Sequence, residues 1–507
     1  MLEVFGEWLE NLILLSCMKE RNIESNPFRQ FNWKHPLVGA TLFFVVNLIL
    51  RSIQLTKNPL SGDEPFTLYH AQMQPEIIVS ELLKGNNPPL FELLLHYWIG
   101  WKDISLQWVR ILPLIFSAFT AFFLYLLANK IKKGYFPIFV SLIYMFSVYH
   151  LQFGQEIRVY SLFGCLTVIS MWIFLKVWRD EAKLKWWIAL VIVNSCMIYS
   201  HYFGFFLLLI QTILIFSDAS LFKKSIKKYV LYVLAMMLLY IPLIPIILHH
   251  FVFNEKGVGT WLTPASSVED LYNMLWQFSN KPVVTVIGIA ILLSAVVKYL
   301  LSKDKKLKVE AKLLFVWFIV SFFGMFVISF KIPMYLDRYL IYGSFSYILL
   351  LVYAIGYVFP TIKGQVIASA ILVVLFGVTF SLYSPTKRNA PLISEEIIKA
   401  RANGYSVILC PKENVTNFVY YYNVNYFKLV DAKPLYQRMF QKLSNENIFP
   451  VWHISEVKKA SDKWLFVDVA ASLTLPNNGV FDSLQEHYTL IKEEKLDEVT
   501  KAYYFQK

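Results

Sequence analysis

The chain has 507 residues, of which 57% are hydrophobic and 16% charged, and its mean hydropathy is +0.49. Soluble domains usually carry about 25% charged residues, so this composition excludes an ordinary soluble protein, a disordered chain and a collagen-like fibre. The net charge of +13 comes without a nucleic-acid motif or an interleaved basic and aromatic patch, so nucleic acid is not an expected partner. The composition predicts a polytopic membrane protein.

Apolar runs follow a tail of 35 residues, which contains acidic side chains and lacks the long apolar core of a signal peptide. About 20 apolar residues cross a bilayer as a helix, and we interpret eleven runs in this way. They cover residues 36–55, 107–129, 135–151, 159–177, 186–201, 203–219, 229–251, 282–301, 312–330, 340–359 and 364–383.

Lysine clusters occupy alternate loops between these runs and predict the orientation. They are Lys130–Lys133, Lys176–Lys185, Lys223–Lys228, Lys303–Lys308 and Lys363. The positive-inside rule places these loops in the cytoplasm with the tail 1–35. The loops 56–106, 152–158, around 202, 252–281 and 331–339 then lie outside. Within the first outer loop, Leu68 to Leu83 resembles one amphipathic helix along the interface.

The composition changes after residue 383. Residues 384–507 hold 16 Lys/Arg and 14 Asp/Glu in 124 positions, which is ordinary soluble composition. Short strands are predicted at 405–410 and 463–468, and helices at 394–403, capped by its first residue Ser394, and at 434–443. The predicted fold is an all-α polytopic membrane domain of about eleven helices over 36–383, followed by a small extracytoplasmic α/β domain at 384–507.

Two carboxylates, Asp63 and Glu64, follow the first run directly and lie on the predicted outer face. Adjacent acids can divide labour, because one accepts a proton while the other holds a positive partner or a metal ion. Solvated acids that mark a helix end before Pro65 would explain the pair equally well.

A second polar cluster is Gln155-Glu156-Ile157-Arg158-Val159-Tyr160. If a helix begins at Glu156, its side chain shares a face with Tyr160 four residues later. Ionisable groups at membrane depth cost about 2.5–3.5 kcal/mol, so they usually face a cavity or a partner. A Glu156–Arg158 pair at the water boundary is the alternative, but the acids and Arg158 on one membrane face favour a site.

Two further outer segments carry polar side chains. His201 and Tyr202 lie in the turn after residue 200, where an aromatic belt is the alternative for the tyrosine and a hydrogen bond to substrate suits the histidine. Lys331 and Arg338 suit a phosphate, Arg through bidentate bonds and Lys as a point charge. Simple flanking charge explains them less well, because basic residues at span ends prefer the inside.

Together these strings resemble the GT-C superfamily of membrane glycosyltransferases, closest to the bacterial branch related to protein O-mannosyltransferases and lipid A aminoarabinose transferases. The resemblance covers about residues 36–383 as architecture. The matching strings are Asp63-Glu64, Asn87-Pro88-Pro89-Leu90, Gln155-Glu156-x-Arg158-x-Tyr160, His201-Tyr202-Phe203-Gly204 and Asp337-Arg338-Tyr339.

The resemblance implies a site in which a sugar passes from a polyprenyl phosphate to an acceptor on the outer face. Asp63 would be the catalytic general base, Glu64 would support it, and Glu156 would line the same cavity, although many relatives have Asp there. The implied phosphate-binding residues are Arg158, Lys331 and Arg338, and the implied substrate-binding residues are Tyr160, His201, Tyr202 and Tyr339.

The same resemblance implies a mannosyltransferase-like hexosyltransferase of the bacterial inner membrane. Its partners would be the lipid-linked sugar, a lipid, glycan or protein acceptor, and membrane lipids, and a divalent metal ion is the one cofactor left open. A glycan ligase with a lipid-linked donor is an alternative, as is a non-catalytic transporter or scaffold. Transporters often show repeated halves and polar groups at mid-span, whereas this sequence has charged clusters at one face and no convincing repeat.

Overall fold

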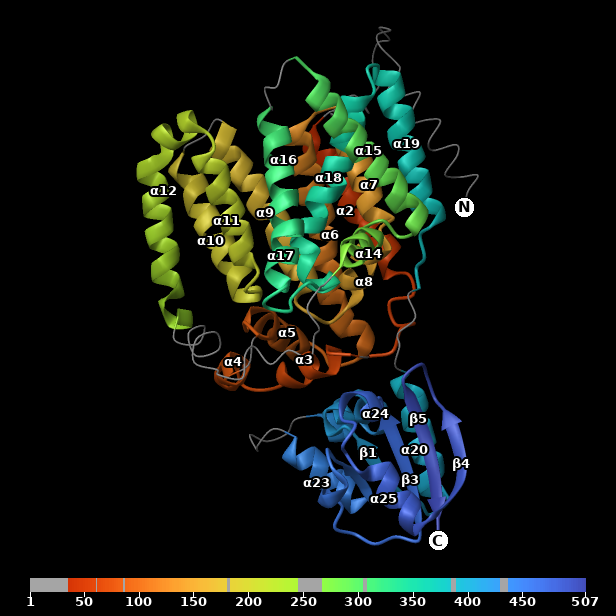
Figure 1. Cartoon of the computed structure of the whole chain (residues 1–507). Helices are drawn as coiled ribbons and strands as arrows, with labels where there is room; N and C mark the ends of the chain where they lie inside the picture. Colours follow the sequence, from red (N-terminus) through yellow and green to blue (C-terminus); the bar gives the residue numbers. More distant parts are fainter. Residues whose placement is uncertain are drawn as a thin grey trace, which may run out of the picture.

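The computed structural model describes residues 35–60, 62–84, 87–179, 183–244, 267–303, 308–383, 389–428 and 436–507. The predicted tail 1–35 therefore lies outside the described residues except for its last position, and so does the first half of the predicted loop 252–281. The described chain forms a large helical part and a smaller part built on a five-stranded sheet (Figure 1).

Apolar helices make up the large part, and each of the eleven predicted runs overlaps one helix or helix pair. The helices are α2 (Pro36–Ser52), α6 (Leu106–Ile131), α7 (Phe136–Met145), α8 (Val148–Gln155), α9 (Tyr160–Arg179), α10 (Leu184–Ser200), α11 (Gly204–Phe216), α12 (Ala219–Tyr240), α14 (Val268–Phe278), α15 (Pro282–Leu301), α16 (Val309–Ile319), α17 (Met325–Ser329), α18 (Ile341–Val358) and α19 (Ile362–Val378). A π-helical segment, Val320–Gly324, joins α16 to α17.

Length and apolar composition allow six of the described helical segments to cross a membrane, or seven if the pair α7–α8, bent by 62°, counts as one span. Four other predicted runs form apolar helices of 13 to 17 residues, namely α2, α10, α11 and α19. The all-α membrane character of this part is confirmed. That all eleven runs cross the membrane remains a prediction.

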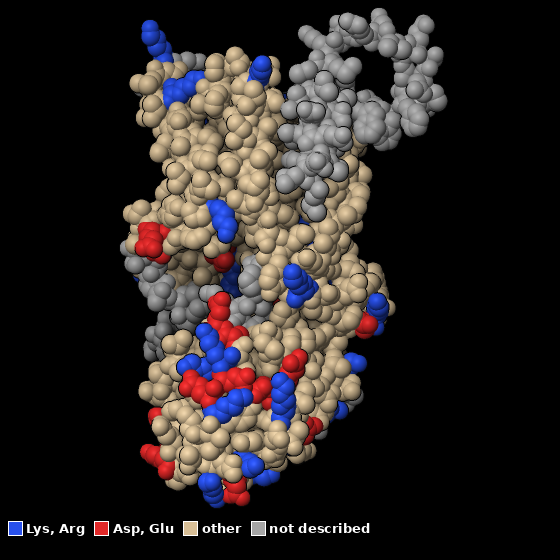
Figure 2. Space-filling model, turned by 90° about the vertical axis from the view of Figure 1, so that its right-hand side faces the viewer, with Lys and Arg blue, Asp and Glu red and all other residues tan. Residues whose placement is uncertain are grey.

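The helical bundle buries its centre and exposes apolar side chains at its rim. In Figure 1, α6, α7 and α18 lie in the middle, and α12 lies at the outer edge. Large apolar side chains are exposed on α12 and α15, among them Leu231, Leu238, Leu300 and Leu301. On the face shown in Figure 2, charged side chains gather over the sheet-containing part, and most of the helical part is uncharged. A lipid environment accounts for this pattern because water would not solvate such a surface.

Three short helices form an outer layer across one end of the bundle: α3 (Glu64–His70), α4 (Pro75–Lys84) and α5 (Leu90–Gly100) (Figure 1). The prediction of one interfacial helix from Leu68 to Leu83 is wrong, because the chain turns between α3 and α4. Pro75 accounts for the break, since proline cannot continue a preceding helix and restricts the residue before it. The helix α5 was not predicted.

The smaller part contains a sheet with strand order β2-β1-β3-β5-β4. The parallel strands are β1 (Ser406–Cys410), β2 (Ile448–Pro450) and β3 (Lys463–Val469), and the antiparallel strands are β4 (Thr489–Lys495) and β5 (Thr500–Gln506). The helices around it are α20 (Ala390–Ala402), α21 (Val415–Tyr422), α22 (Val424–Phe427), α23 (Gln437–Asn445), α24 (Ala471–Thr474) and α25 (Val480–His487). The α/β character and both predicted strands are confirmed.

The start of α20 differs from its prediction. Asn389 caps this helix by accepting a hydrogen bond from Leu392 N at 3.4 Å. Ser394 lies inside the helix, where its hydroxyl donates to the carbonyls of Ala390 and Phe418 at 2.9 and 2.8 Å. The prediction of a cap at Ser394 is therefore wrong, because an interior serine can satisfy its hydroxyl with the carbonyl four residues earlier.

The two parts share a hydrophobic cluster. It combines buried side chains of the outer layer with side chains of α20, α21 and α23, including Leu68, Phe91, Ile393, Phe418 and Leu443. This contact places the sheet-containing part, referred to below as the C-terminal domain, directly against the layer that begins with Asp63 and Glu64.

Candidate active site

The two neighbouring acids at the start of α3 have opposite environments. The Asp63 side chain is 48% exposed, whereas the Glu64 side chain is 4% exposed. The turn before α3 includes Gly62 with φ +61°, a left-handed backbone that glycine adopts without steric cost. One carboxylate is therefore available to a ligand, and the other belongs to the interior.

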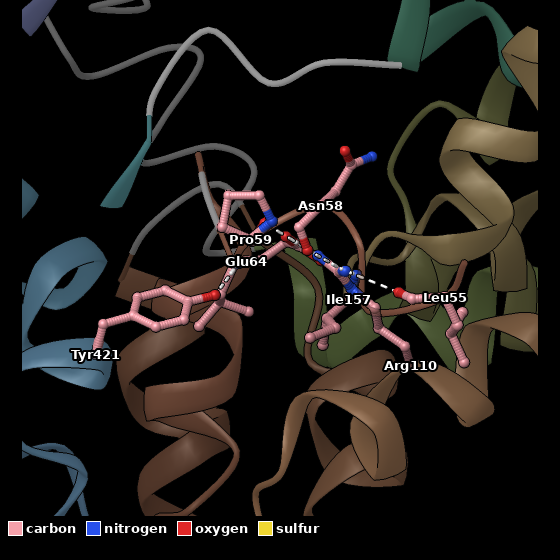
Figure 3. A network of polar contacts seen from close by, with 8 residues as sticks. Leu55, Asn58, Pro59, Glu64, Arg110, Ile157 and Tyr421 are labelled. Atoms are coloured by element: carbon pink, nitrogen blue, oxygen red, sulfur yellow. Dashed lines mark hydrogen bonds and ion pairs between the residues drawn. The ribbon is translucent and has the colours of Figure 1, made fainter. Parts of the chain in front are cut away.

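Glu64 forms a buried ion pair with Arg110 of α6. The Nη2 atom of Arg110 lies 2.9 Å from Oε2 and 3.1 Å from Oε1 of Glu64, and both side chains are 4% exposed. The same guanidinium donates to the carbonyls of Leu55, Asn58 and Pro59 at 3.0, 2.7 and 3.2 Å (Figure 3). Arg110 thus binds both ends of the loop between α2 and α3.

Glu64 also reaches the segment between α8 and α9, because its Oε1 accepts the backbone N–H of Ile157 at 2.9 Å. It therefore joins three segments: the first outer loop, α6 and residues 156–159. Removing one partner of a buried ion pair leaves an uncompensated charge, which typically costs about 3–5 kcal/mol. Sequence reasoning missed Arg110, although a basic residue at the predicted outer end of a span departs from the positive-inside rule.

Asp63 lies beside two of the predicted phosphate-binding arginines. Its Oδ2 lies 3.0 Å from Nη1 of Arg338 and 4.0 Å from Nη2 of Arg158. Arg158 comes from the segment between α8 and α9, and Arg338 comes from the 3₁₀ turn Asp337–Leu340 that precedes α18. The Nε atoms of both arginines are buried and have no hydrogen-bond partner among the described residues. The fold thus gathers a carboxylate and two guanidiniums from distant segments.

A buried acid that sequence reasoning missed lies behind Arg158. The Nη1 atom of Arg158 donates to Oγ1 of Thr67 at 2.6 Å, and this hydroxyl donates to Oε1 of Glu92 at 3.3 Å. Burial raises the pKa of the Glu92 carboxyl, and Arg158 opposes that shift. The available signal was an acid inside the apolar run of α5, since ionisable groups there need a partner.

Glu156 ends α8 with extended backbone, and the next helix begins at Tyr160, so the prediction that the two share a helix face is wrong. Burial and then repulsion from Glu64 raise the pKa of Glu156 to about 8, although Arg158 and Arg338 pull it down. At neutral pH this carboxyl is therefore mostly protonated and can donate a hydrogen bond.

Aromatic side chains surround the arginines. The Arg158 guanidinium lies 5.9 Å from the ring centre of Tyr160, and that of Arg338 lies 5.5 Å from the ring centre of Tyr339. His201 packs 5.6 Å from the Tyr339 ring. Burial and the two arginines lower the pKa of His201 to about 3, so its imidazole is neutral at physiological pH.

Two of the predicted site residues form no hydrogen bond or ion pair with the other described residues of the site. The Tyr202 hydroxyl is buried without a hydrogen-bond partner among the described residues. Lys331 is exposed, and its side chain makes no ion pair or hydrogen bond with any residue that the structure describes. No group of three or more His, Cys, Asp or Glu side chains in the described ranges is placed to hold a metal ion.

Comparisons with known proteins concern the fold and one segment of the chain. A family model described as dolichyl-phosphate-mannose-protein mannosyltransferase matches residues 86–246, about a third of the chain. The archaeal oligosaccharyltransferase AglB from Archaeoglobus fulgidus, solved with an inhibitory peptide and a dolichol-phosphate, is similar in fold at 10% identity. Its TM-score is 0.52, and the match covers 94% of this chain and 74% of that protein.

A second similar structure is ArnT from Cupriavidus metallidurans in the apo state, with 10% identity, a TM-score of 0.45 and coverage of 92% of this chain and 97% of that one. The search of curated proteins gave no match. The family model and the archaeal fold confirm the resemblance predicted from the sequence: this chain is a membrane protein with the fold of the GT-C superfamily of glycosyltransferases.

Proposed function

We propose that this protein transfers a sugar from a polyprenyl-phosphate-linked donor to an acceptor hydroxyl, with Asp63 as the general base. The observation that carries this proposal is the half-exposed Asp63 carboxylate beside Arg158 and Arg338, whose buried Nε atoms have no partner among the described residues. The carboxylate can accept the proton of the acceptor hydroxyl, and the two planar cations can bind the phosphate that leaves.

The arginines suit the leaving group. Breaking the bond between the sugar C1 and the phosphate oxygen leaves an anionic lipid phosphate, and cations placed in advance stabilise the charge that develops there. Guanidinium groups bind phosphate oxygens through bidentate, charge-assisted bonds. A bound phosphate would compete with Asp63 for Arg338, and this competition would release the carboxylate for its role as base.

The carboxylate suits the acceptor. As the acceptor oxygen attacks C1, its proton passes to Asp63, and the electron pair of the broken C1–O bond leaves with the phosphate. This displacement inverts the configuration at C1. Glu156, protonated at neutral pH, would add no second negative charge next to the phosphate.

The surroundings support a reaction at the membrane surface. The site lies at the end of the bundle that carries α3, α4, α5 and the C-terminal domain (Figure 1). The lysine pattern predicts that this end faces outside, with the N-terminus in the cytoplasm. We propose a bacterial inner membrane as the location, following the bacterial branch that the sequence resembles. We propose a hexose donor because the matching family model is described as a mannosyltransferase.

Replacing Asp63→Asn tests the proposal. The amide keeps the size of the side chain but cannot accept the proton, so turnover of a polyprenyl-phosphate hexose should fall by ~10²-fold or more, with lipid binding largely retained. Product formation and donor affinity would be measured in detergent. The control is Glu76→Gln, which neutralises an exposed acid on α4 in the same outer layer. Turnover near the wild-type rate in Asp63→Asn would contradict the assignment.

A further inference from the structure

The loop that leads into Asp63 is held by the C-terminal domain. Tyr421 of α21 points its hydroxyl at this loop, where the oxygen accepts the backbone N–H of Leu60 at 2.5 Å (Figure 3). Leu60 is completely buried and lies three residues before Asp63. A side chain 361 residues away in sequence therefore fixes the main chain next to the proposed base.

Arg110 holds the same loop from the membrane domain. It donates to the carbonyls of Leu55, Asn58 and Pro59, and it pairs with Glu64. The loop carrying Asp63 is thus bonded through its carbonyls to the membrane domain and through an N–H to the C-terminal domain. The Asp63 side chain is half exposed, so its position depends on this backbone more than on packing of its own.

Leu60 also packs in the hydrophobic cluster that joins the two parts, but two further contacts of the C-terminal domain lie outside this loop. Tyr420, next to Tyr421, donates to the carbonyl of Ile104 at 3.0 Å, just before α6 begins. The ring of Tyr69 stacks on Tyr436 at 5.0 Å between centroids. These contacts can dock the domain without the Tyr421 hydroxyl, which allows docking and loop positioning to be tested separately.

We propose that Tyr421 is a positioning residue, through which the C-terminal domain sets the position of Asp63 for transfer. The inference rests on the function proposed above. Without the Tyr421 hydroxyl the buried Leu60 N–H loses its partner, and a buried unpaired donor drives the backbone to rearrange. A misplacement of about 1 Å at a reacting group can reduce a rate by up to ~10²-fold.

The test compares Tyr421→Phe with Tyr420→Phe. Each removes one hydroxyl and one hydrogen bond between the same two domains, so both should lower the melting temperature to a similar, small extent. Tyr421→Phe alone should lower kcat, by ~10-fold, with the KM for the lipid donor nearly unchanged. Equal kcat values in the two variants, or a fall in melting temperature that accounts for the lost activity, would overturn the inference.

A second measurement keeps this test separate from the proposed function. In a chain without its natural cysteines, Asp63→Cys reports the exposure and position of residue 63 through its rate of alkylation. Adding Tyr421→Phe should change that rate at least ~3-fold, and adding Tyr420→Phe should not, whatever substrate the protein uses. An unchanged alkylation rate would overturn the inference, whereas a wild-type protein without transferase activity would contradict the proposed function alone.

Discussion

Asp63 and Glu64 show how adjacent residues of similar chemistry acquire different roles. The sequence predicted a division of labour between them, but it could not show which acid would be exposed. Glu64 is the buried acid because its carboxylate forms an ion pair inside the protein with Arg110, which is 46 residues away in sequence. Glu92 escaped prediction for the same reason, because its connection to Arg158 runs through the hydroxyl of Thr67. Spacing in the sequence cannot reveal such a link.

The two arginines beside Asp63 should not tolerate exchange for lysine. Arg158→Lys or Arg338→Lys keeps the charge but loses the planar pair of donors, so affinity for a polyprenyl-phosphate sugar or turnover should fall by the equivalent of ~1–3 kcal/mol. Binding of the donor would be titrated in detergent. Arg401→Lys, at a carbonyl-bonded arginine of the C-terminal domain, serves as the control. Free replacement at both site positions would show that they only anchor span ends.

Glu156 should give the reaction a pH dependence. With its pKa raised to about 8, the carboxyl is neutral below this pH and ionised above it, so a negative charge appears near the donor phosphate as the pH rises. We expect kcat/KM of the wild-type protein to fall above pH 8. In Glu156→Gln this fall should be absent. His201, with a pKa of about 3, should contribute no step near neutral pH.

The same shift has a consequence for stability. A folded-state pKa above the ordinary value of 4.5 means that the neutral carboxyl is favoured in the folded protein. The corresponding stabilisation is complete below about pH 4.5 and is lost as the pH rises through 8. Thermal unfolding of Glu156→Gln should therefore depend less on pH in this window than that of the wild type. Parallel curves for the two proteins would contradict the assigned pKa.

At the scale of elements, hydropathy located the long apolar helices because a membrane selects continuous apolar runs. It did not resolve the outer layer, where short helices mix polar and apolar positions. It also gave no indication of the role of Arg51 at the end of α2. This buried guanidinium donates to the Ser117 hydroxyl at 2.5 Å, the Tyr144 hydroxyl at 3.1 Å and the His150 carbonyl at 2.7 Å. Its partners are neutral and distant in sequence, so no charge pattern marks them.

The Glu64–Arg110 pair should hold the elements of the outer layer together. Glu64→Gln leaves Arg110 buried without a counter-ion, and the free energy of unfolding should fall by ~3–5 kcal/mol. Glu64→Leu combined with Arg110→Met should recover only part of this loss. Two apolar side chains leave no buried charge, but the three carbonyls bound by Arg110 and the Ile157 N–H lose their partners. Transfer activity should stay low in the double variant, since the loop before Asp63 loses its bonds.

An exposed ion pair of the same layer provides the control for the Glu64 and Arg110 variants. Glu81 pairs with Lys84 on α4 at 2.6 Å, with both side chains largely or partly in solvent. Exposed ion pairs contribute about 0–1 kcal/mol to the free energy of unfolding, so Glu81→Gln should have little effect on the melting temperature. If Glu81→Gln and Glu64→Gln lowered the stability by similar amounts, burial would not increase the contribution of the Glu64–Arg110 pair.

At the scale of the whole molecule, the lysine pattern predicts which end of the bundle is exposed to the outside. In a chain without its natural cysteines, a membrane-impermeant thiol reagent added from outside should modify Lys102→Cys and spare Lys133→Cys. Both positions are exposed and lie near opposite ends of α6. The measurement is labelling in intact cells. Reversed labelling would place Asp63 on the cytoplasmic side, where the proposed reaction could not serve an outer acceptor.

The position of β5 in the sheet has a consequence for the order of synthesis. This strand is the last of the five in chain order, yet it lies between β3 and β4 and pairs with both. On the ribosome, the membrane helices and the loop with Asp63 emerge long before residues 500–506. Strands β1, β2 and β3 pair without those residues, but β4 has no neighbour in the sheet until β5 is available. An unfinished chain would therefore contain every residue of the proposed site while the sheet of the domain that carries Tyr421 still lacks two of its five strands.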